Sequence, residues 1–442
     1  MDVLRLFGAQ DEKFTHYFSY YNGVFFNSIE YDGEFFDFEQ KREVADDVEY
    51  KRFAKRFAKL AFYDLLSKVK NVQLPWGALT GIRPTKLAYM SVSQGEDFIK
   101  TLGDMRVSTE NIRLVQRILQ TQEKIYKNAG GQDLFVSLPF CPTKCEYCSF
   151  ITAPLATTKK YVEPYLNSLV KEIESVKDIM LRPKSIYIGG GTPFAISADE
   201  LERVYMAIAS LNLPPVEYTV EAGRPDVFDE EKLRLSKDFG ITRICINPQS
   251  FSDQTLAKIG RKHTEKQVYQ AFEMAQKYNF DVNLDLIAGL ADESVSDFEN
   301  SLSKAIALNP ANITVHTLSL KSGARLKENV KALNVDGIDQ MLALSRKALT
   351  DAGYNPYYMY RQKYQAGGRE NCGWAKPEKE CVYNVDVMEE IADNVAVGAN
   401  AISKRLFDDG ERIERCASPK DLKTYIEKTD QIILERNQLF TR

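Results

Sequence analysis

The stretch LFVSLPFCPTKCEYCSF, residues 134–150, carries three cysteines in a CxxxCxxC spacing directly after a short apolar run. They are Cys141, Cys145 and Cys148. Unrelated buried cysteines have no reason to adopt this spacing, whereas three thiolates close together on one loop can hold a metal centre. Three ligands are one fewer than a closed structural zinc site or a fully ligated iron–sulfur cluster requires. The stretch therefore predicts a metal centre whose last position is either open or filled from elsewhere.

A zinc knuckle is the simplest alternative, and it needs a fourth cysteine or histidine nearby. The histidines are His16, His263 and His316, and the next cysteine along the chain is Cys245, so no local fourth ligand exists. Completion of a zinc site by a distant residue stays open. A [4Fe–4S] cluster with one free iron fits the spacing better.

The composition is typical of a folded enzyme, because 44% of the residues are hydrophobic and 11% aromatic. A length of 442 residues suits one large domain with one or two smaller ones. The 58 basic and 62 acidic residues form no basic stripe, so we expect no nucleic-acid partner. The first residues do not combine a basic region with a long apolar one, so we expect no secretory signal, and without a run of ~18 apolar residues we expect no membrane span. Seven cysteines argue against a disulfide framework, and we expect a cytoplasmic protein with reduced thiols.

After Gly130-Gly131 the sequence alternates between apolar strands and helices. Such alternation is typical of a parallel sheet covered by helices, and six units are fewer than the eight of a closed barrel. The predicted fold is therefore α/β, a partial, six-unit parallel β/α barrel, with ligands at the carboxyl ends of its strands. The expected strands are 134–138, 185–188, 216–220, 243–246, 281–287 and 312–317, and the expected helices lie near 161–180, 198–211, 230–238, 264–278 and 295–307.

The residues before this barrel have a different pattern. An aromatic segment, 16–38, has turn signals at Asn22-Gly23 and Asp32-Gly33 and predicts a β-meander, while residues 48–70 have apolar residues at helical spacing. We therefore divide the chain into an N-terminal α+β domain of unassigned role (1–130), the barrel (131–320) and a mainly helical C-terminal region that covers the substrate (321–442).

The cysteine spacing, with the aromatic residue Tyr147 before the third cysteine, resembles the signature of the radical S-adenosylmethionine (SAM) enzymes. The resemblance implies a barrel of radical SAM type in which Cys141, Cys145 and Cys148 bind a [4Fe–4S] cluster. It also implies that the open iron chelates the amino and carboxylate groups of SAM, whose cleavage releases a 5′-deoxyadenosyl radical. The radical chemistry then belongs to the cluster and SAM, while the protein positions both.

Further motifs continue this resemblance at successive strand ends. The segment GGGTP, residues 189–193, is similar to the family's glycine motif, and glycines after a strand allow the backbone to approach a ligand closely. Asp285 is a carboxylate inside an otherwise apolar strand and needs a polar partner. Carboxylates accept hydrogen bonds from ribose hydroxyls, and a guanidinium pairs with a carboxylate. The resemblance implies that SAM is bound by Phe135, Tyr147, Gly190, Gly191, Thr192, Glu221, Gln249, Arg261 and Asp285, with Ser319 and Ile402 as further candidates.

The particular residues in these motifs indicate a narrower family within the radical SAM enzymes. PFCPTKCEYCSF, GGGTP, TVEAGRP, PQSF, GRKHT, DLIAGL and GANAIS together resemble the oxygen-independent coproporphyrinogen III dehydrogenase (oxidase) family, which includes related heme chaperones, over residues 132–405. The resemblance implies oxidative decarboxylation of coproporphyrinogen III propionates to the vinyl groups of protoporphyrinogen IX in heme biosynthesis. It also implies a reduced flavodoxin- or ferredoxin-type electron donor. A heme chaperone that binds heme without decarboxylation and a radical SAM methyltransferase that opens heme are the two alternatives.

Two positions depart from the better-studied dehydrogenases. Phe150 stands where they have a fourth cysteine, as in the chaperone-like relatives, and Phe135 stands where they have a tyrosine. Neither replacement removes a cluster ligand, but both weaken the transfer of the decarboxylase activity to this chain.

A substrate with four propionates needs cationic contacts and an aromatic-lined pocket. A Tyr-rich covering loop with solvated charges is the equally weighted alternative for the C-terminal region. His316 is a candidate heme ligand or proton donor, although a lone histidine is more often a hydrogen-bonded core residue. Cys372 and Cys381 are interpreted as ordinary reduced cysteines. The candidate substrate contacts are Lys321, Arg361, Lys363, Arg369 and Arg405, beside Tyr354, Tyr357, Tyr358, Tyr360, Tyr364 and Trp374.

Overall fold

The computed structural model describes residues 2–148, 153–319, 335–362 and 368–441. The chain forms two compact units, which are described separately below. The smaller unit comprises Met1–Gln116 together with Arg361–Glu370, and the larger comprises Arg117–Tyr360 together with Asn371–Arg442. Within the described residues no helix is long and apolar enough to cross a membrane.

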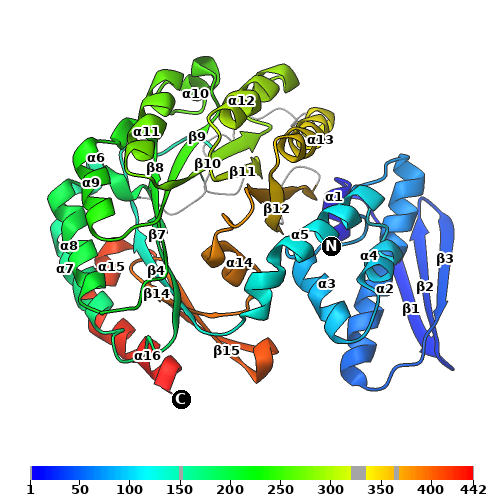
Figure 1. Ribbon diagram of the computed structural model, residues 1–442. Coiled ribbons are helices and arrows are strands. Elements are labelled where there is room, and N and C mark those ends of the chain that lie inside the picture. The colour runs from blue at the N-terminus through cyan, green and yellow to red at the C-terminus, as the bar shows by residue number, and fades with distance from the viewer. Residues whose placement is uncertain (1, 149–152, 320–334, 363–367, 442) are drawn as a thin grey trace. The chain divides into compact units, whose positions relative to one another are not determined.

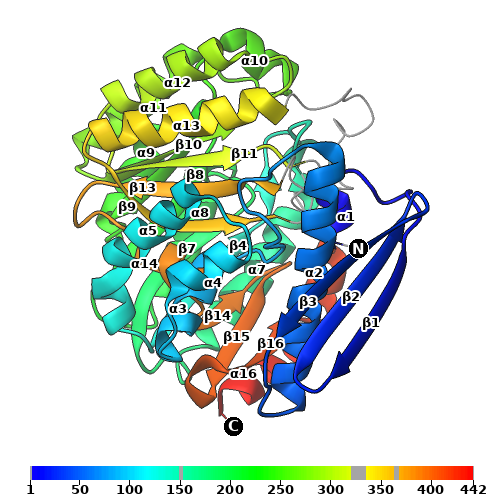
Figure 2. The same cartoon turned by 90° about the vertical axis from the view of Figure 1, so that its right-hand side faces the viewer.

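The smaller unit contains the predicted β-meander and the helix that follows it (Figure 2). Strands β1 (Thr15–Tyr21), β2 (Val24–Tyr31) and β3 (Glu34–Lys41) pair antiparallel. Both turns place an Asn or Asp and then a Gly at positive φ, the geometry that tight hairpins favour. Helix α2 (Asp47–Lys70) begins after Asp46, whose carboxylate accepts from two backbone N–H groups. Both the meander and the helix predictions are confirmed.

The core of this unit lies between the meander and α2. Phe25 and Ile29 of β2 are fully buried, and they pack against Phe53, Phe57 and Leu65 of α2. The apolar residues of α2 fall on one face because they recur three and four positions apart. The remaining helices are α1 (Asp2–Leu6), α3 (Pro84–Ser93), α4 (Phe98–Asp104) and α5 (Thr109–Lys127), of which α5 spans the boundary between the units.

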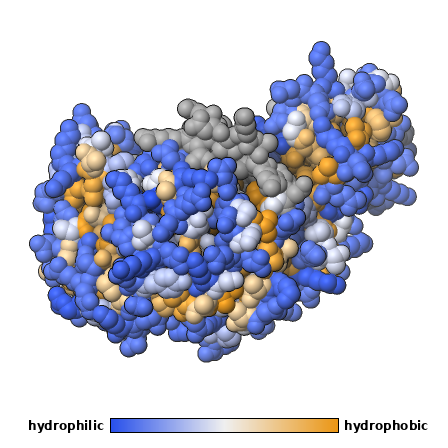
Figure 3. All heavy atoms as spheres, turned by 90° about the horizontal axis from the view of Figure 1, so that it is seen from above, coloured by the Kyte–Doolittle hydropathy of each residue, from blue (hydrophilic) through white to orange (hydrophobic). Residues whose placement is uncertain are grey.

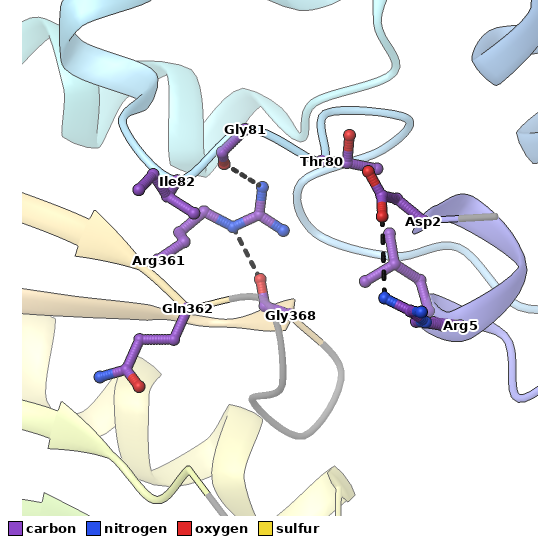
Figure 4. Close-up of a pocket in the computed structure, with 9 residues that line it drawn as sticks. Asp2, Arg5, Thr80, Gly81, Ile82, Arg361, Gln362 and Gly368 are labelled. Atoms are coloured by element: carbon purple, nitrogen blue, oxygen red, sulfur yellow. Dashed lines mark hydrogen bonds and ion pairs between the residues drawn. The ribbon is translucent and has the colours of Figure 1, made fainter. Parts of the chain in front are cut away.

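Arg361 is a buried member of the smaller unit. Its Nε donates to the Gly368 carbonyl at 2.8 Å and its Nη1 to the Gly81 carbonyl at 3.3 Å (Figure 4). Nη1 also donates to the Leu79 carbonyl. The guanidinium also lies 5.2 Å from the centre of the Trp76 ring, and burial lowers the pKa of Arg361 to about 10. Nε and Nη1 of Arg361 are directed at backbone carbonyls inside this unit, which favours the structural alternative over a propionate contact.

The larger unit is built on one curved sheet (Figure 1). Its six predicted parallel strands are confirmed, in the spatial order in which they follow along the chain. They are β4 (Gln132–Leu138), β7 (Pro183–Gly190), β8 (Glu217–Gly223), β9 (Arg243–Gln249), β10 (Asp281–Ala288) and β11 (Asn312–Thr317).

A seventh parallel strand, β14 (Asp393–Val397), pairs with β4 on the side opposite β7. The strand is only five residues long, just its last three residues are apolar, and Gly398 follows it, so the sequence pattern did not identify it as part of the barrel. The C-terminal region was expected to be mainly helical. This expectation is wrong, because the region supplies further strands of the sheet. They are β12 (Asn355–Arg361) and β13 (Glu370–Ala375) beyond β11, and β15 (Ile402–Phe407) and β16 (Arg412–Ala417) beyond β14.

Helices cover the outer face of the sheet, while α14 (Val382–Glu389) lies on its inner side (Figure 1). Ser197, Thr264 and Ser294 begin three of the outer helices with reciprocal side-chain and backbone hydrogen bonds, which fixes where those helices start. Hydrophilic residues predominate on the face that Figure 3 shows. The other helices are α6 (Leu155–Thr158), α7 (Val162–Glu174), α8 (Ala198–Ala209), α9 (Glu230–Asp238), α10 (Asp253–Lys258), α11 (Glu265–Lys277), α12 (Val295–Ala307), α13 (Val335–Asp351), α15 (Leu422–Glu427) and α16 (Thr429–Thr441).

Candidate functional site

A ring of partly exposed side chains runs round the inside of the barrel. Apart from positions at the strand ends, each of the six strands from β4 to β11 has one partly exposed residue between buried neighbours. Because helices cover the outer face, a partly exposed residue in mid-strand faces the barrel interior. The six residues of this interior ring are Phe135, Tyr187, Glu221, Asn247, Asp285 and His316.

The aromatic side of the interior ring is formed by Phe135 and Tyr187. Their ring centres are 6.3 Å apart, and both stack on Tyr383 of α14, at 6.1 and 4.5 Å. Phe135 was predicted to contact SAM from the sequence. The structure places it at mid-strand in this aromatic stack, inside the barrel.

The polar side of the interior ring brings two carboxylates together. The Asn247 amide lies between them: its Nδ2 is 3.3 Å from Glu221 Oε1, and in the opposite amide orientation it donates to Asp285 Oδ2 at 3.2 Å. Burial and the neighbouring Asp285 raise the pKa of Glu221 to about 7. Near neutral pH the Glu221 carboxyl group can therefore hold or release a proton.

Asp285 has the polar partner that its position in an apolar strand requires. Asn283 Nδ2 donates to Asp285 Oδ1 at 2.7 Å, and His316 Nε2 lies 3.5 Å from Asp285 Oδ2. The other ring nitrogen of His316 lies 3.3 Å from the Tyr360 hydroxyl. His316 thus has polar partners at both ring nitrogens, one of which is Asp285 of the carboxylate pair.

The cysteine loop begins directly after β4 and is held by backbone hydrogen bonds. Cys141 lies in the short strand β5 (Phe140–Cys141), which pairs with β6 (Ala153–Pro154). The Cys148 N–H donates to the Cys145 carbonyl at 3.1 Å, which closes a turn between these two cysteines. None of the three cysteines forms a disulfide. Burial, with the nearby thiols of Cys148 and Cys145, raises the pKa of Cys141 to about 12.

The glycine segment after β7 packs directly against the cysteine loop. A Cβ atom at Gly191 would lie 2.6 Å from the Pro139 carbonyl oxygen, and Gly190 has φ +110°. Both positions therefore require glycine. The next residue, Thr192, donates its N–H to the Phe140 carbonyl at 2.8 Å, and its Oγ1 lies 3.4 Å from Cys141 Sγ. The predicted close approach of backbone at this segment is present, and its described partner is the cysteine loop.

Arg261 also contacts the cysteine loop. Its Nη1 donates to the Tyr147 hydroxyl at 2.9 Å and lies 3.8 Å from Cys145 Sγ, while Nη2 donates to the Asn247 carbonyl. Arg261 therefore links the cysteine loop to the strand that carries Asn247. Tyr147 packs among apolar side chains that include Ile259 and Leu318.

Two further predicted residues present buried polar atoms. Gln249 ends β9 with φ 69°, and its Oε1 is buried without a hydrogen-bond partner among the described residues. Ser319 Oγ is likewise buried without a hydrogen-bond partner among the described residues. A buried polar atom without a partner is costly, so such atoms suit a site where a polar ligand completes the hydrogen bonds. Ile402, by contrast, is partly exposed at the start of β15, where its carbonyl accepts from Asn394.

The residues present fit an iron–sulfur cluster and SAM. Within the described residues no three Cys, His, Asp or Glu side chains are grouped as ligands of a single metal ion would be. A [4Fe–4S] cluster makes a different demand, since each thiolate binds a separate iron. Cys141 would not ionise at neutral pH by itself, and bound iron takes the place of its proton. The unpartnered Gln249 Oε1 and the Glu221–Asp285 pair offer acceptors to an adjacent ligand.

The aromatic candidates of the C-terminal region belong mainly to the core. Tyr354, Tyr357 and Trp374 are almost completely buried, and the Tyr354 hydroxyl donates to the Pro310 carbonyl at 2.7 Å. Arg405 donates to the Leu439 carbonyl at 2.7 Å. Four residues of the sequence analysis lie outside the described ranges: Phe150, Lys321, Lys363 and Tyr364.

The sequence analysis did not single out Asn247, Arg224 and Thr143. Asn247 lies two positions before Gln249, so the alternation of side chains in a strand places both on one face. Arg224 follows β8 immediately and is 3% exposed, and its Nη1 donates to Thr143 Oγ1 at 2.6 Å. A charged residue next to a strand end in the TVEAGRP motif was a signal available in the sequence.

Comparison with known proteins agrees with this architecture. A model of the radical SAM superfamily matches residues 135–305. The oxygen-independent coproporphyrinogen-III oxidase-like protein HemZ of Bacillus subtilis is 35% identical over 405 residues, which are 86% of this chain and 81% of that protein. The heme chaperone HemW of Lactococcus lactis is 36% identical over 190 residues, 42% of this chain and 49% of that protein.

Among solved structures, the coproporphyrinogen III oxidase HemN from Escherichia coli, a radical SAM enzyme, matches with a TM-score of 0.57. The match covers 71% of this chain and 72% of HemN at 21% identity, and it shows that the fold is shared. The similarity to HemZ extends over most of both chains. The chain therefore belongs to the radical SAM superfamily, whose [4Fe–4S] cluster and SAM are its cofactors, and within that superfamily to the family of the coproporphyrinogen-III oxidase-like protein HemZ.

Proposed function

We propose that this protein is a radical SAM enzyme that converts propionate side chains of coproporphyrinogen III to vinyl groups. One observation carries the proposal: the 35% identity to a coproporphyrinogen-III oxidase-like protein extends over 86% of the chain, far beyond the segment that matches the superfamily model. A likeness confined to the cofactor site would support radical chemistry alone. Likeness through the C-terminal region as well supports a related substrate.

In this proposal Cys141, Cys145 and Cys148 hold the cluster beside the glycine segment. When bound, the cluster and SAM supply a carbon radical that abstracts a hydrogen atom. The side chains of Glu221 and Asp285 accept hydrogen bonds from the ribose hydroxyls, and Gln249 Oε1 accepts from SAM. The further SAM contacts in the proposal are Tyr147, Gly190, Gly191, Thr192, Arg261 and Ser319, with Phe135 and Ile402 as the least supported by their positions.

The overall conversion balances with an external electron acceptor. Each propionate loses one hydrogen atom from the carbon next to the pyrrole, then carbon dioxide and one electron, and a vinyl group remains. Cleavage of SAM requires one electron, for which we propose a reduced flavodoxin- or ferredoxin-type donor in the cytoplasm. The interior ring contains aromatic Phe135 and Tyr187 as well as polar residues such as His316, which suits pyrrole rings with polar substituents.

An anaerobic assay tests the proposal. The protein with a reconstituted cluster is incubated with dithionite, SAM and coproporphyrinogen III, and the products are separated by chromatography. We expect vinyl-containing product and 5′-deoxyadenosine in a matched ratio. Absence of vinyl product, with the cluster and SAM cleavage intact, would contradict the proposed substrate.

A heme chaperone is the second candidate, and two observations favour it. HemW of Lactococcus lactis is 36% identical over 190 residues, and Phe150 stands where the better-studied dehydrogenases have a fourth cysteine. A chaperone would bind heme in a one-to-one complex and transfer it to an acceptor protein without consuming coproporphyrinogen III. Heme titration followed by absorbance, run beside the turnover assay, distinguishes the two functions.

A further inference from the structure

Arg224 is a buried cation that contacts the cysteine loop, and it belongs to neither the proposed cluster ligands nor the proposed SAM contacts. It lies between the end of β8 and the 3-10 turn at Pro225–Val227, and its side chain is 3% exposed. A buried guanidinium is costly unless its charge and its donors are satisfied. For Arg224 both are satisfied, and one partner belongs to the cysteine loop.

Asp226 holds one side of the guanidinium. Nε donates to Asp226 Oδ1 at 2.9 Å and Nη2 to Asp226 Oδ2 at 2.6 Å, a bidentate pair that fixes the plane of the guanidinium. Because this orientation is fixed from within the same turn, Nη1 is directed outward. It donates to Thr143 Oγ1 at 2.6 Å, across 81 residues of sequence.

Thr143 lies between Cys141 and Cys145, in the three-residue segment that separates the first two cysteines. A hydrogen bond to its side chain therefore acts on the conformation of the segment that sets the spacing of two thiolates. Arg261 approaches the same loop at Cys145 and Tyr147. Two buried guanidiniums, those of Arg224 and Arg261, thus contact the cysteine loop.

The ring of His263, which contacts Arg261, adds no charge of its own. His263 is 2% exposed, and its Nδ1 lies 3.4 Å from Arg261 Nε. Burial and Arg261 lower the pKa of His263 to about 3, so the ring is neutral near pH 7.

We propose that Arg224 is a positioning residue for the iron–sulfur cluster: through Thr143 it holds the loop that carries the cluster cysteines, and its fixed charge stabilises the reduced cluster. This inference rests on the proposed cluster site. A buried positive charge near the cluster favours the more negative, reduced form, and hydrogen bonds and charge are the means by which proteins set cluster potentials. Removal of the charge therefore lowers the reduction potential.

Substitutions separate the hydrogen bond from the charge. Arg224→Gln removes both, Arg224→Lys keeps the charge without the fork that joins Asp226 to Thr143, and Thr143→Val removes only the acceptor hydroxyl. The control is Arg203→Gln, which breaks exposed contacts of Arg203 with Glu163 and Asn167.

The first readout is a redox titration of the loaded cluster followed by absorbance and electron paramagnetic resonance. For Arg224→Gln we expect about a tenfold smaller ratio of reduced to oxidised cluster at a fixed potential, which is a shift of about 59 mV for one electron. Arg224→Lys should stay within about threefold of the wild type. If Arg224→Gln equals the Arg203→Gln control, or if Arg224→Lys equals Arg224→Gln, the charge role is overturned.

The second readout is the loop itself, measured without activity. Hydrogen exchange of apoprotein peptides covering residues 140–148, and the rate at which a chelator removes iron from the loaded protein, should both rise at least about fivefold in Arg224→Gln, Arg224→Lys and Thr143→Val. Rates equal to those of the Arg203→Gln control overturn the positioning role. The exchange measurement needs no cluster, so it is decided separately from the proposed function.

Asp226→Asn covers the case in which Arg224→Gln fails to fold. It keeps the guanidinium and removes the neighbouring negative charge, so the reduced fraction should increase, opposite in sign to Arg224→Gln. A decrease would overturn the electrostatic assignment. If the wild-type protein does not convert coproporphyrinogen III, the proposed function is contradicted, but these cluster measurements stay valid.

Discussion

The barrel strands begin among oppositely charged pairs and end beside two neighbouring carboxylates. At the amino ends, Lys184 Nζ lies 2.8 Å from Asp386 Oδ2, and Arg243 Nη2 lies 3.2 Å from Glu217 Oε2. At the carboxyl ends, Glu221 and Asp285 share Asn247 and His316. Opposite charges at one end stabilise the fold, whereas like charges and unpartnered acceptors at the other end suit the binding of a ligand.

The comparison also separates two kinds of buried cysteine. Cys381 lies at the amino end, where its Sγ is 3.2 Å from Glu217 Oε1, and burial raises its pKa above the usual range. Cys141 and Cys145 lie at the carboxyl end, beside Thr192 and Arg261. Cys141 and Cys145 share a loop with a third cysteine, whereas Cys381 does not. We therefore expect substitutions at the two ends of the strands to have different consequences.

The largest effect is expected at the cysteine loop. Cys145→Ala removes one cluster ligand, so the visible absorbance of the cluster and all SAM cleavage should be lost while the protein stays folded. Cys416→Ser, in β16 and away from the loop, is the control and should retain both. Iron content, absorbance and 5′-deoxyadenosine yield are measured. Full cluster and activity in Cys145→Ala would contradict the assignment of the cluster site.

The next effect is expected at the amino end. Arg243→Met leaves Glu217 buried without its cation and should lower the free energy of unfolding by about 3–5 kcal/mol. SAM affinity of the folded fraction should change little, since Arg243 lies at the opposite strand ends. Urea unfolding and calorimetric SAM binding test this. Lys124→Met breaks the exposed pair with Glu378 and should cost less than about 1 kcal/mol.

A smaller effect is expected from the protonation of Glu221. Its pKa is about 7 in the folded protein, so the carboxylate is mostly protonated at pH 6 and mostly ionised at pH 8. The ionised form accepts hydrogen bonds from both ribose hydroxyls, so SAM should bind about tenfold more tightly at pH 8 than at pH 6. Glu221→Gln should remove this pH dependence. If the SAM affinity of Glu221→Gln still rises about tenfold from pH 6 to pH 8, another group is responsible.

The smallest effect is expected at the edge of the interior ring. Tyr360→Phe removes the hydroxyl 3.3 Å from His316 Nδ1 and should reduce the rate of turnover by about two- to fivefold, in line with one neutral hydrogen bond. His316→Ala, which also removes the contact with Asp285, should reduce it further. Single-turnover kinetics measure both. Equal rates in the wild type and both variants would remove His316 from the site.

Local sequence determined the barrel strands, the cysteine loop and the turns of the meander. A strand needs a short apolar run, a hairpin turn needs Asn-Gly or Asp-Gly, and three loop cysteines lie close together whatever surrounds them. These features depend on residues that are neighbours in the chain. For the same reason β14 was missed: its five residues are informative only beside β4, more than 250 residues earlier.

The tertiary structure alone decided which polar groups meet. Register shifts between Val220 and Gly223, and between Leu284 and Leu286, bring the ends of β8, β9 and β10 to the positions at which Asn247 lies between Glu221 and Asp285. Arg224 meets Thr143 across 81 residues, and Arg361 is enclosed by carbonyls of a distant loop. Side-chain contacts of this kind follow from register and packing over long sequence separations, which residue type and spacing do not encode.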